Sequence, residues 1–188
     1  MLNRLILILL FTLTHFGFSE SRFYKIPIEG IAAIVNDQII PFSSVRRMSE
    51  TSERLLRESY EEKKIKSEEL VEKIKETRIK SLQALIDREL IIQDFKSQHY
   101  SIPPEILDEQ ITEKIKNNFA GSRDDFIRTL NAEGMTVDDY REELTHNLIV
   151  SAMRERNVTR KTKDPEEGHK LQEEWIHGLR EKAFIKTF

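Results

Sequence analysis

The sequence predicts a mainly α-helical fold with one small antiparallel sheet. Residues 30–42 (GIAAIVNDQIIPF) place two short apolar runs on either side of Asn36-Asp37, and both of these residue types favour turns. The segment Ala183–Phe188 (AFIKTF) is rich in good strand formers. Between these two segments, apolar residues recur at the three-to-four spacing of helices. We therefore expect a hairpin, a series of helices and a final strand.

The hairpin needs a partner. An isolated two-stranded hairpin is marginally stable in water, so a further element must pair with it or cover it. The other strand candidate lies at the far end of the chain. We therefore predict that Ala183–Phe188 pairs with the hairpin and that the two ends of the mature chain meet.

Residues 1–19 have the features of a secretory signal peptide. One charge, Arg4, precedes the unbroken apolar stretch Leu5–Leu13, and the small residues Gly17 and Ser19 follow. This pattern predicts cleavage after about Ser19. The apolar stretch is shorter than the roughly 20 residues that span a bilayer, so we expect no stable membrane span after cleavage. An uncleaved N-terminal anchor is the alternative.

The composition excludes several functions. The 188 residues carry a net charge of −3, from 30 basic and 33 acidic residues, which argues against nucleic acid as the main partner. The chain contains no cysteine, so it has no disulfide, no thiolate metal site and no cysteine nucleophile. A basic run between Arg154 and Lys163 is followed at once by acidic residues, and we interpret it as a solvated linker.

The first two helices are expected near residues 45 and 67. Ser43 or Ser44 can cap a helix that begins near Val45. Its continuation, Arg57–Lys66, is mostly charged and is either a solvated helical extension or a loop. Ser67 then begins a long helix that ends around Lys96–His99.

Proline, glycine and capping residues mark the later helices. Ile102-Pro103-Pro104 predicts an extended entry to a helix that runs to about Phe119. Two compact helices follow, with capping signals at Ser122–Asp125 and Thr136–Asp139 and with Gly134 between them. The second of these helices carries an apolar stripe formed by Val137, Tyr140, Leu144, Leu148 and Ala152.

The chain closes with a connector, a helix and the final strand. Residues 157–168 are polar and predict a connector, in which Asp164-Pro165 provides a strong helix start. The last helix carries Leu171, Trp175 and Leu179 and leads directly into Ala183–Phe188.

The order of these elements resembles the N-terminal chaperone domain of SurA-type parvulin proteins. The resemblance rests on GIAAIVNDQIIPFSSV, on residues 82–115 and 126–158, and on the tail LQEEWIHGLREKAFIKTF, whose pattern is similar to the closing helix and strand of that family. It implies a mainly α, SurA N-terminal-like helical domain. Its expected parts are a signal peptide (1–19), the helical domain (20–158), and a linker with the C-terminal helix and strand (159–188).

The chain departs from the family pattern in one respect. SurA-type proteins usually carry parvulin isomerase domains between these two blocks, whereas here only a dozen polar residues join them. We therefore expect no proline isomerase activity and no enzyme.

The sequence contains few signals for catalysis or for metal and cofactor binding. No metalloprotease, P-loop, nucleophile-elbow or dinucleotide motif occurs. His169 and His177 lie eight residues apart on the last helix, about 80° apart around its axis, which is a poor arrangement for a metal. We expect neither a cofactor nor a metal.

The resemblance implies an ATP-independent periplasmic chaperone for unfolded or partly folded polypeptides, with outer-membrane proteins as one candidate class. The candidate peptide-binding residues are Phe119, Phe126, Met135 and Tyr140, near helix ends and loops. The alternative is that all four belong to the ordinary core. Alternative functions are a structural or adaptor module with one dedicated partner and a residual isomerase.

Overall fold

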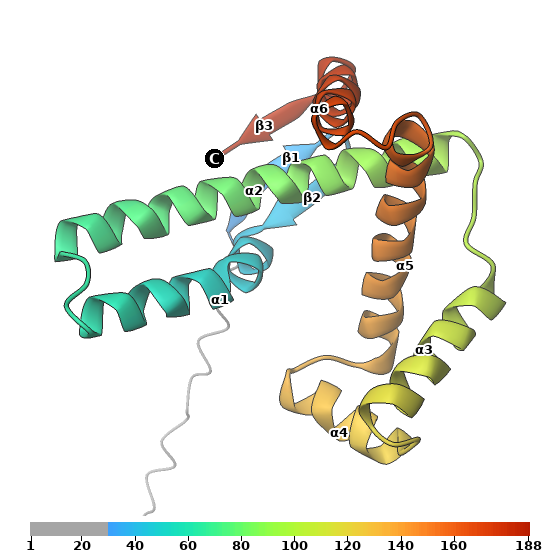
Figure 1. Cartoon of the computed structure of the whole chain (residues 1–188), viewed down its shortest axis with the longest axis horizontal. Coiled ribbons are helices and arrows are strands. Elements are labelled where there is room, and N and C mark those ends of the chain that lie inside the picture. Colours follow the sequence, from blue (N-terminus) through green and yellow to red (C-terminus); the bar gives the residue numbers. More distant parts are fainter. Residues whose placement is uncertain (1–29) are drawn as a thin grey trace, which may run out of the picture.

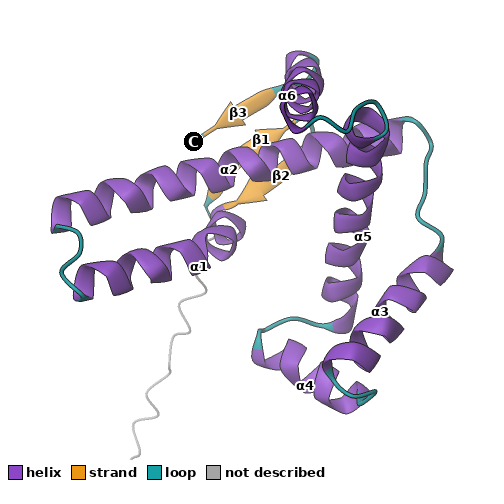
Figure 2. Cartoon of the chain, in the orientation of Figure 1, coloured by secondary structure: helices purple, strands orange, loops and turns teal. Residues whose placement is uncertain are grey.

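The computed structural model describes residues 30–188, so the predicted signal peptide lies outside the described residues. The described part of the chain is mainly α-helical with one small sheet, as predicted (Figures 1 and 2). In chain order the elements are β1 (Ile31–Val35), β2 (Gln38–Pro41), α1 (Phe42–Glu61), α2 (Ser67–Ser97), α3 (Pro104–Asn118), α4 (Arg123–Ala132), α5 (Val137–Arg154), a π-helical segment η1 (Glu155–Thr159), α6 (Pro165–Glu181) and β3 (Ile185–Thr187).

The two ends of the described chain meet in the sheet. The strand order is β2-β1-β3, and both pairs are antiparallel. Ile34 pairs with Ile39 of β2 and with Lys186 of β3. This arrangement confirms the predicted pairing of the C-terminal strand with the hairpin.

Asn36, in the hairpin turn, connects the sheet to the rest of the fold. It adopts a left-handed conformation (φ 56°), which asparagine tolerates better than most residues. Its backbone N–H donates to the carbonyl of Phe184 at 2.7 Å, and its side-chain oxygen accepts the Phe184 N–H at 2.8 Å. Its side-chain amide donates to Gln93 of α2 at 2.5 Å, and Gln93 donates to the Val35 carbonyl at 3.1 Å. One turn residue therefore links β1, β3 and α2.

Three hydrophobic clusters hold the fold, and the long helix α2 contributes to two of them. The first cluster packs the inner face of the sheet against α1 and α2, around Val35 and Ile86. The second packs the end of α2 against α5 and α6, around Ile92 and Met153. The third joins α3, α4 and the start of α5, around Phe126 and Leu130.

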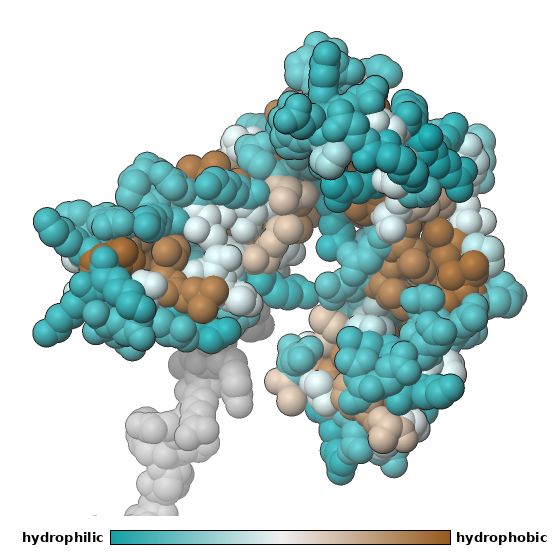
Figure 3. All heavy atoms as spheres, in the orientation of Figure 1, coloured by the Kyte–Doolittle hydropathy of each residue, from teal (hydrophilic) through white to brown (hydrophobic). Residues whose placement is uncertain are grey.

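Two arms extend from this centre. We call α1 with residues 67–81 of α2 the hairpin arm, and α3, α4 and residues 137–147 of α5 the pocket arm. Figure 3 shows open space between the two arms and apolar side chains on the surface of both. Large apolar residues of the hairpin arm that are 43–64% exposed are Phe42, Met48, Leu55, Tyr60, Val71 and Ile79.

The structure corrects the predicted start of the first helix. The helix begins at Phe42, directly after Pro41, and no side chain caps it. The Phe42 N–H donates instead to the Gly30 carbonyl at 2.9 Å, so the backbone of the sheet replaces a serine cap. The charged segment Arg57–Lys66 is partly helix and partly loop. The helix continues to Glu61, and a turn with Lys63 at φ 56° then leads to α2.

The structure also corrects the end of the α5 stripe and the connector. Ala152 is exposed, whereas Ile149 and Met153 are buried, because the second half of α5 packs on α2 and α6 rather than on α3. Residues 157–168 are not one linker: Val158 in η1 is 6% exposed, and α6 already begins at Pro165. The predicted Asp164 cap and Pro165 start are confirmed.

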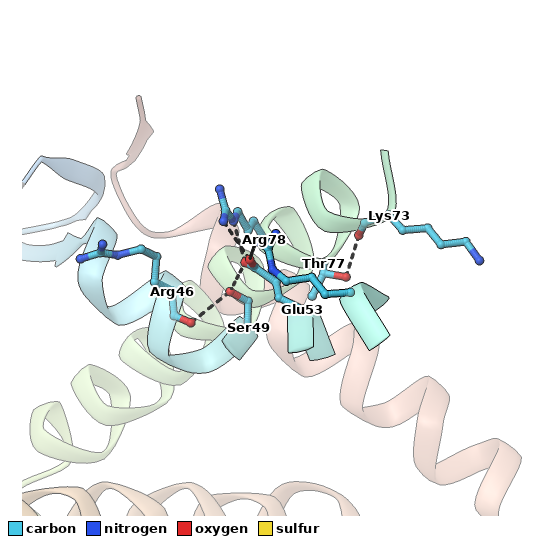
Figure 4. Close-up of polar contacts among 7 residues, drawn as sticks. Arg46, Ser49, Glu53, Lys73, Thr77 and Arg78 are labelled. Carbon is cyan, nitrogen blue, oxygen red and sulfur yellow. Dashed lines mark hydrogen bonds and ion pairs between the residues drawn. The ribbon is translucent and has the colours of Figure 1, made fainter. Parts of the chain in front are cut away.

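A buried carboxylate joins the two helices of the hairpin arm (Figure 4). Glu53 of α1 is 8% exposed and accepts two hydrogen bonds from Arg78 of α2, at 2.6 and 2.8 Å. Ser49 donates a third at 2.8 Å, and Arg57 donates a fourth at 3.3 Å. The hydrogen bonds from Arg78 lower the pKa of Glu53 from 4.5 to about 2, against the opposing effect of burial.

Stability should therefore depend on Glu53 above its unfolded pKa of 4.5 and lose that contribution as the pH falls toward 2. Because the partner arginines are half-exposed, we expect Glu53→Gln to lower the free energy of unfolding by about 2 kcal/mol at pH 7. The difference from the unsubstituted protein should shrink between pH 4.5 and pH 3. Urea denaturation at several pH values measures this. Glu58→Gln, which breaks only an exposed pair with Arg54, is the matched control, and equal effects of the two substitutions would contradict the account.

Candidate functional site

The pocket arm is shaped by two tight helix ends. At the end of α3, Ala120 (φ 50°) and Gly121 (φ 85°) turn the chain in the left-handed region, and the Gly121 N–H donates to the Ile115 carbonyl at 3.0 Å. Ser122 then caps α4 by accepting the Asp125 N–H at 3.2 Å. This turn places Phe119, at the end of α3, beside α4.

Met135 is positioned by a Schellman motif at the end of α4. Gly134 (φ 69°) follows the last helical turn, as the sequence predicted. The Gly134 N–H donates to the Asn131 carbonyl at 3.1 Å, and the Met135 N–H donates to the Leu130 carbonyl at 2.9 Å. This hydrogen-bond pattern brings the side chain after the glycine back onto the last helical turn, so Met135 lies next to Leu130.

Tyr140 is positioned by the predicted capping box of α5. The Asp139 N–H donates to the Thr136 hydroxyl at 3.1 Å, and the Thr136 N–H donates to the Asp139 carboxylate at 2.9 Å. The box fixes the first turn of α5, so the Tyr140 ring points toward α4. Arg141, one residue later, forms an ion pair with Asp108 and joins α5 to α3.

The residues of the pocket arm line an open pocket of about 330 Å³, and all four candidate residues contribute to its wall. Phe119 directly follows α3, Phe126 lies in α4, Met135 lies in the loop between α4 and α5, and Tyr140 lies in α5. The same four residues belong to the third hydrophobic cluster, so they are both packed together and exposed to the pocket. Whether they bind a peptide remains a prediction.

The aromatic rings form a continuous wall. The Phe126 ring lies 5.6 Å from Phe119 and 5.2 Å from Tyr140, centroid to centroid, both in edge-to-face geometry. Phe126 is only 2% exposed and forms the buried part of the wall, whereas the other two rings are half-buried. Burial, with the nearby Glu143 carboxylate, raises the pKa of Tyr140, so its hydroxyl stays neutral and can donate a hydrogen bond.

Sequence reasoning missed several lining residues. Leu130 and Leu144 add apolar surface, and each follows a predicted pocket residue by four positions on the same helix, so helical spacing could have found them. The remaining lining residues are polar: Lys114, Asn118, Thr129, Glu133, Glu143 and Asn147.

The lining of the pocket suits the binding of apolar side chains. The pocket has the volume for one or two large apolar side chains, with charged and amide groups at its rim. Within residues 30–188, no group of three or more histidine, aspartate or glutamate side chains is placed to hold a metal ion. The same residues contain no helix with the length and hydrophobicity needed to cross a bilayer.

The comparison with known protein families places this chain in one of them. A family model described as the SurA-like N-terminal domain matches residues 2–154, which include the hairpin, the hairpin arm and the pocket arm. Comparison with curated proteins gave no match.

Proposed function

Because the chain belongs to the SurA-like N-terminal domain family, we propose that it is an ATP-independent chaperone that binds unfolded or partly folded polypeptides. The observation that carries this proposal is the pocket of the pocket arm, where four apolar side chains from four segments meet around one open space. We further propose that the protein acts in the periplasm and has no proline isomerase activity. Outer-membrane proteins are the candidate clients.

The pocket supports a weak and reversible mode of binding. Unfolded chains expose single aromatic and aliphatic side chains, and a pocket of about 330 Å³ buries one or two of them at a time. Burial of one large apolar side chain is worth about 1.5–3 kcal/mol, which alone gives low affinity and rapid release. The exposed apolar residues of the hairpin arm provide further contacts of the same kind.

The test is suppression of aggregation by the purified protein. A chemically unfolded outer-membrane β-barrel protein is diluted into buffer, and light scattering is followed with and without the chain, in the absence of ATP. We expect Met135→Ser to weaken client binding about fivefold to tenfold, because it removes apolar surface from the pocket.

Ile127→Ser is the matched control. Ile127 and Met135 are both half-buried against the third hydrophobic cluster, but only Met135 lines the pocket. Equal losses of binding in the two variants would show an effect of arm stability instead of a pocket contact. No suppression by the unsubstituted protein at several-fold molar excess would contradict the chaperone function itself.

A further inference from the structure

One face of the sheet carries large apolar side chains that no helix within residues 30–188 covers. Ile39, Phe184 and Phe188 are 57%, 61% and 60% exposed. Directly paired residues point to the same side of a sheet, so Ile39 shares a face with Ile34 and Lys186. Phe184 and Phe188 lie two residues before and after Lys186 and therefore point to the same side. We call these five residues the outer face. Helix α2 covers the opposite face (Figure 1).

Strand β3 is also an edge of the sheet. Its partner β1 lies on one side, where the Phe188 N–H donates to the Ala32 carbonyl at 3.1 Å and the Phe184 carbonyl accepts the Asn36 N–H at 2.7 Å. Alternate residues of an antiparallel strand direct their backbone groups to opposite sides. Ile185 and Thr187 therefore direct their N–H and C=O groups away from β1, where no strand within residues 30–188 pairs with them.

We propose that the β3 edge binds an extended segment of another polypeptide, which adds a fourth strand to the sheet. The four outward backbone groups of Ile185 and Thr187 require an extended backbone as partner. The outer face then selects the side chains: apolar residues beside Phe184 and Phe188, and an acidic residue beside Lys186. The segment thus has the pattern apolar-x-acidic-x-apolar. The proposal rests on the proposed function only in taking a polypeptide as the ligand.

The charge of Lys186 favours a foreign strand over a second copy of this chain. Two β3 strands paired about their centres would bring two lysines together, and like charges at paired positions destabilise a sheet. Lysine on an edge strand is a common protection against self-pairing. The Lys186 ammonium lies 4.9 Å from the centre of the Phe188 ring, and none of the ion pairs among residues 30–188 includes it. An acidic residue on the added strand would complement it.

The test uses the full chain and short labelled peptides. The probe is the fluorescein-labelled peptide Thr-Val-Thr-Glu-Thr-Val-Thr, and the comparison peptide has lysine in place of the glutamate. Fluorescence anisotropy should show saturable binding of the acidic peptide and about fivefold weaker binding of the basic one. Lys186→Glu should reverse this order, because an exposed acidic side chain at position 186 repels the glutamate peptide and attracts the lysine peptide.

Two modified peptides test the backbone contacts. When the peptide pairs antiparallel to β3 with its glutamate opposite Lys186, the amides of the two threonines beside the glutamate face β3. N-methylation of both should therefore abolish binding. Methylation of the glutamate amide, which faces away, should leave it. Thr187→Pro, which removes an outward N–H at an exposed edge position, should weaken binding of the unmodified peptide.

Three results would overturn the proposal. These are equal binding of the acidic and basic peptides, full binding of the peptide methylated beside the glutamate, and a concentration-dependent dimer that Thr187→Pro dissociates. Met135→Ser should leave peptide binding at the edge unchanged. If the unsubstituted protein suppresses aggregation but does not bind the acidic peptide, this proposal alone is refuted. If it binds the peptide but does not suppress aggregation, the chaperone function is refuted and the edge site stands.

Discussion

Phe126→Ala is expected to unfold the pocket arm while the sheet and the α2–α5–α6 centre stay folded. The ring is 2% exposed and contacts both neighbouring aromatic rings, so its removal leaves a large cavity and costs about 3–5 kcal/mol. The cluster around it is separate from the other two clusters, so the loss falls on α3, α4 and the start of α5. Client binding should be lost together with the arm.

Hydrogen exchange measures this directly. Amides of α3 and α4 should lose protection in Phe126→Ala, whereas those of β1 and of residues 86–95 should keep it. Phe126→Leu, which retains most of the volume, should cost less than about 1.5 kcal/mol and preserve protection of the arm. Uniform loss of protection across all three clusters would show that the chain unfolds as one unit and would contradict the separate arm.

Removal of residues 184–188 is expected to destabilise the whole sheet. The deletion removes both hydrogen bonds between Phe184 and Asn36, the Phe188 bond to Ala32, and the packing of Ile185 against the first cluster. Each of these three hydrogen bonds makes a net contribution of about 1 kcal/mol to stability. We expect a net loss of about 3 kcal/mol in the free energy of unfolding, measured by urea denaturation.

Asn36→Gly isolates the side-chain part of this contact. Glycine keeps the left-handed backbone at φ 56° and the backbone hydrogen bond to the Phe184 carbonyl, but it removes the side-chain bonds to Phe184 and Gln93. We therefore expect a smaller loss of about 1–2 kcal/mol. Thr187→Ala, at an exposed position, should have little effect. If the protein without residues 184–188 has the same free energy of unfolding as the unsubstituted protein, then β3 does not hold the sheet together.

The features that could be predicted from sequence are those determined by residues close together along the chain. Asn36-Asp37 indicated the hairpin, Thr136 and Asp139 indicated the capping box, and Gly134 indicated a helix end. The pairing of β3 with β1 could be inferred because a lone hairpin needs a partner. The four pocket residues lie near helix ends and loops, and the tight turns between the helices bring them together.

The features that could not be predicted depend on tertiary contacts. The start of α1 depends on the Gly30 carbonyl, which is twelve residues away from the N–H that it accepts. Val158 is buried five positions after Met153, a spacing that fits a π-helical turn and falls outside the α-helical period. The Glu53–Arg78 ion pair joins residues 25 positions apart on two helices, so no local pattern indicates it.

The most direct test of the account is an NMR titration of the isotope-labelled protein with a polypeptide that stays unfolded, such as a reduced and alkylated protein. The account predicts that signals of Phe119, Met135 and Tyr140 shift progressively and saturably, whereas those of Ile86 and Ile92 in the other two clusters do not. Saturable binding that leaves the pocket signals unchanged would contradict the assignment of the pocket as the client site.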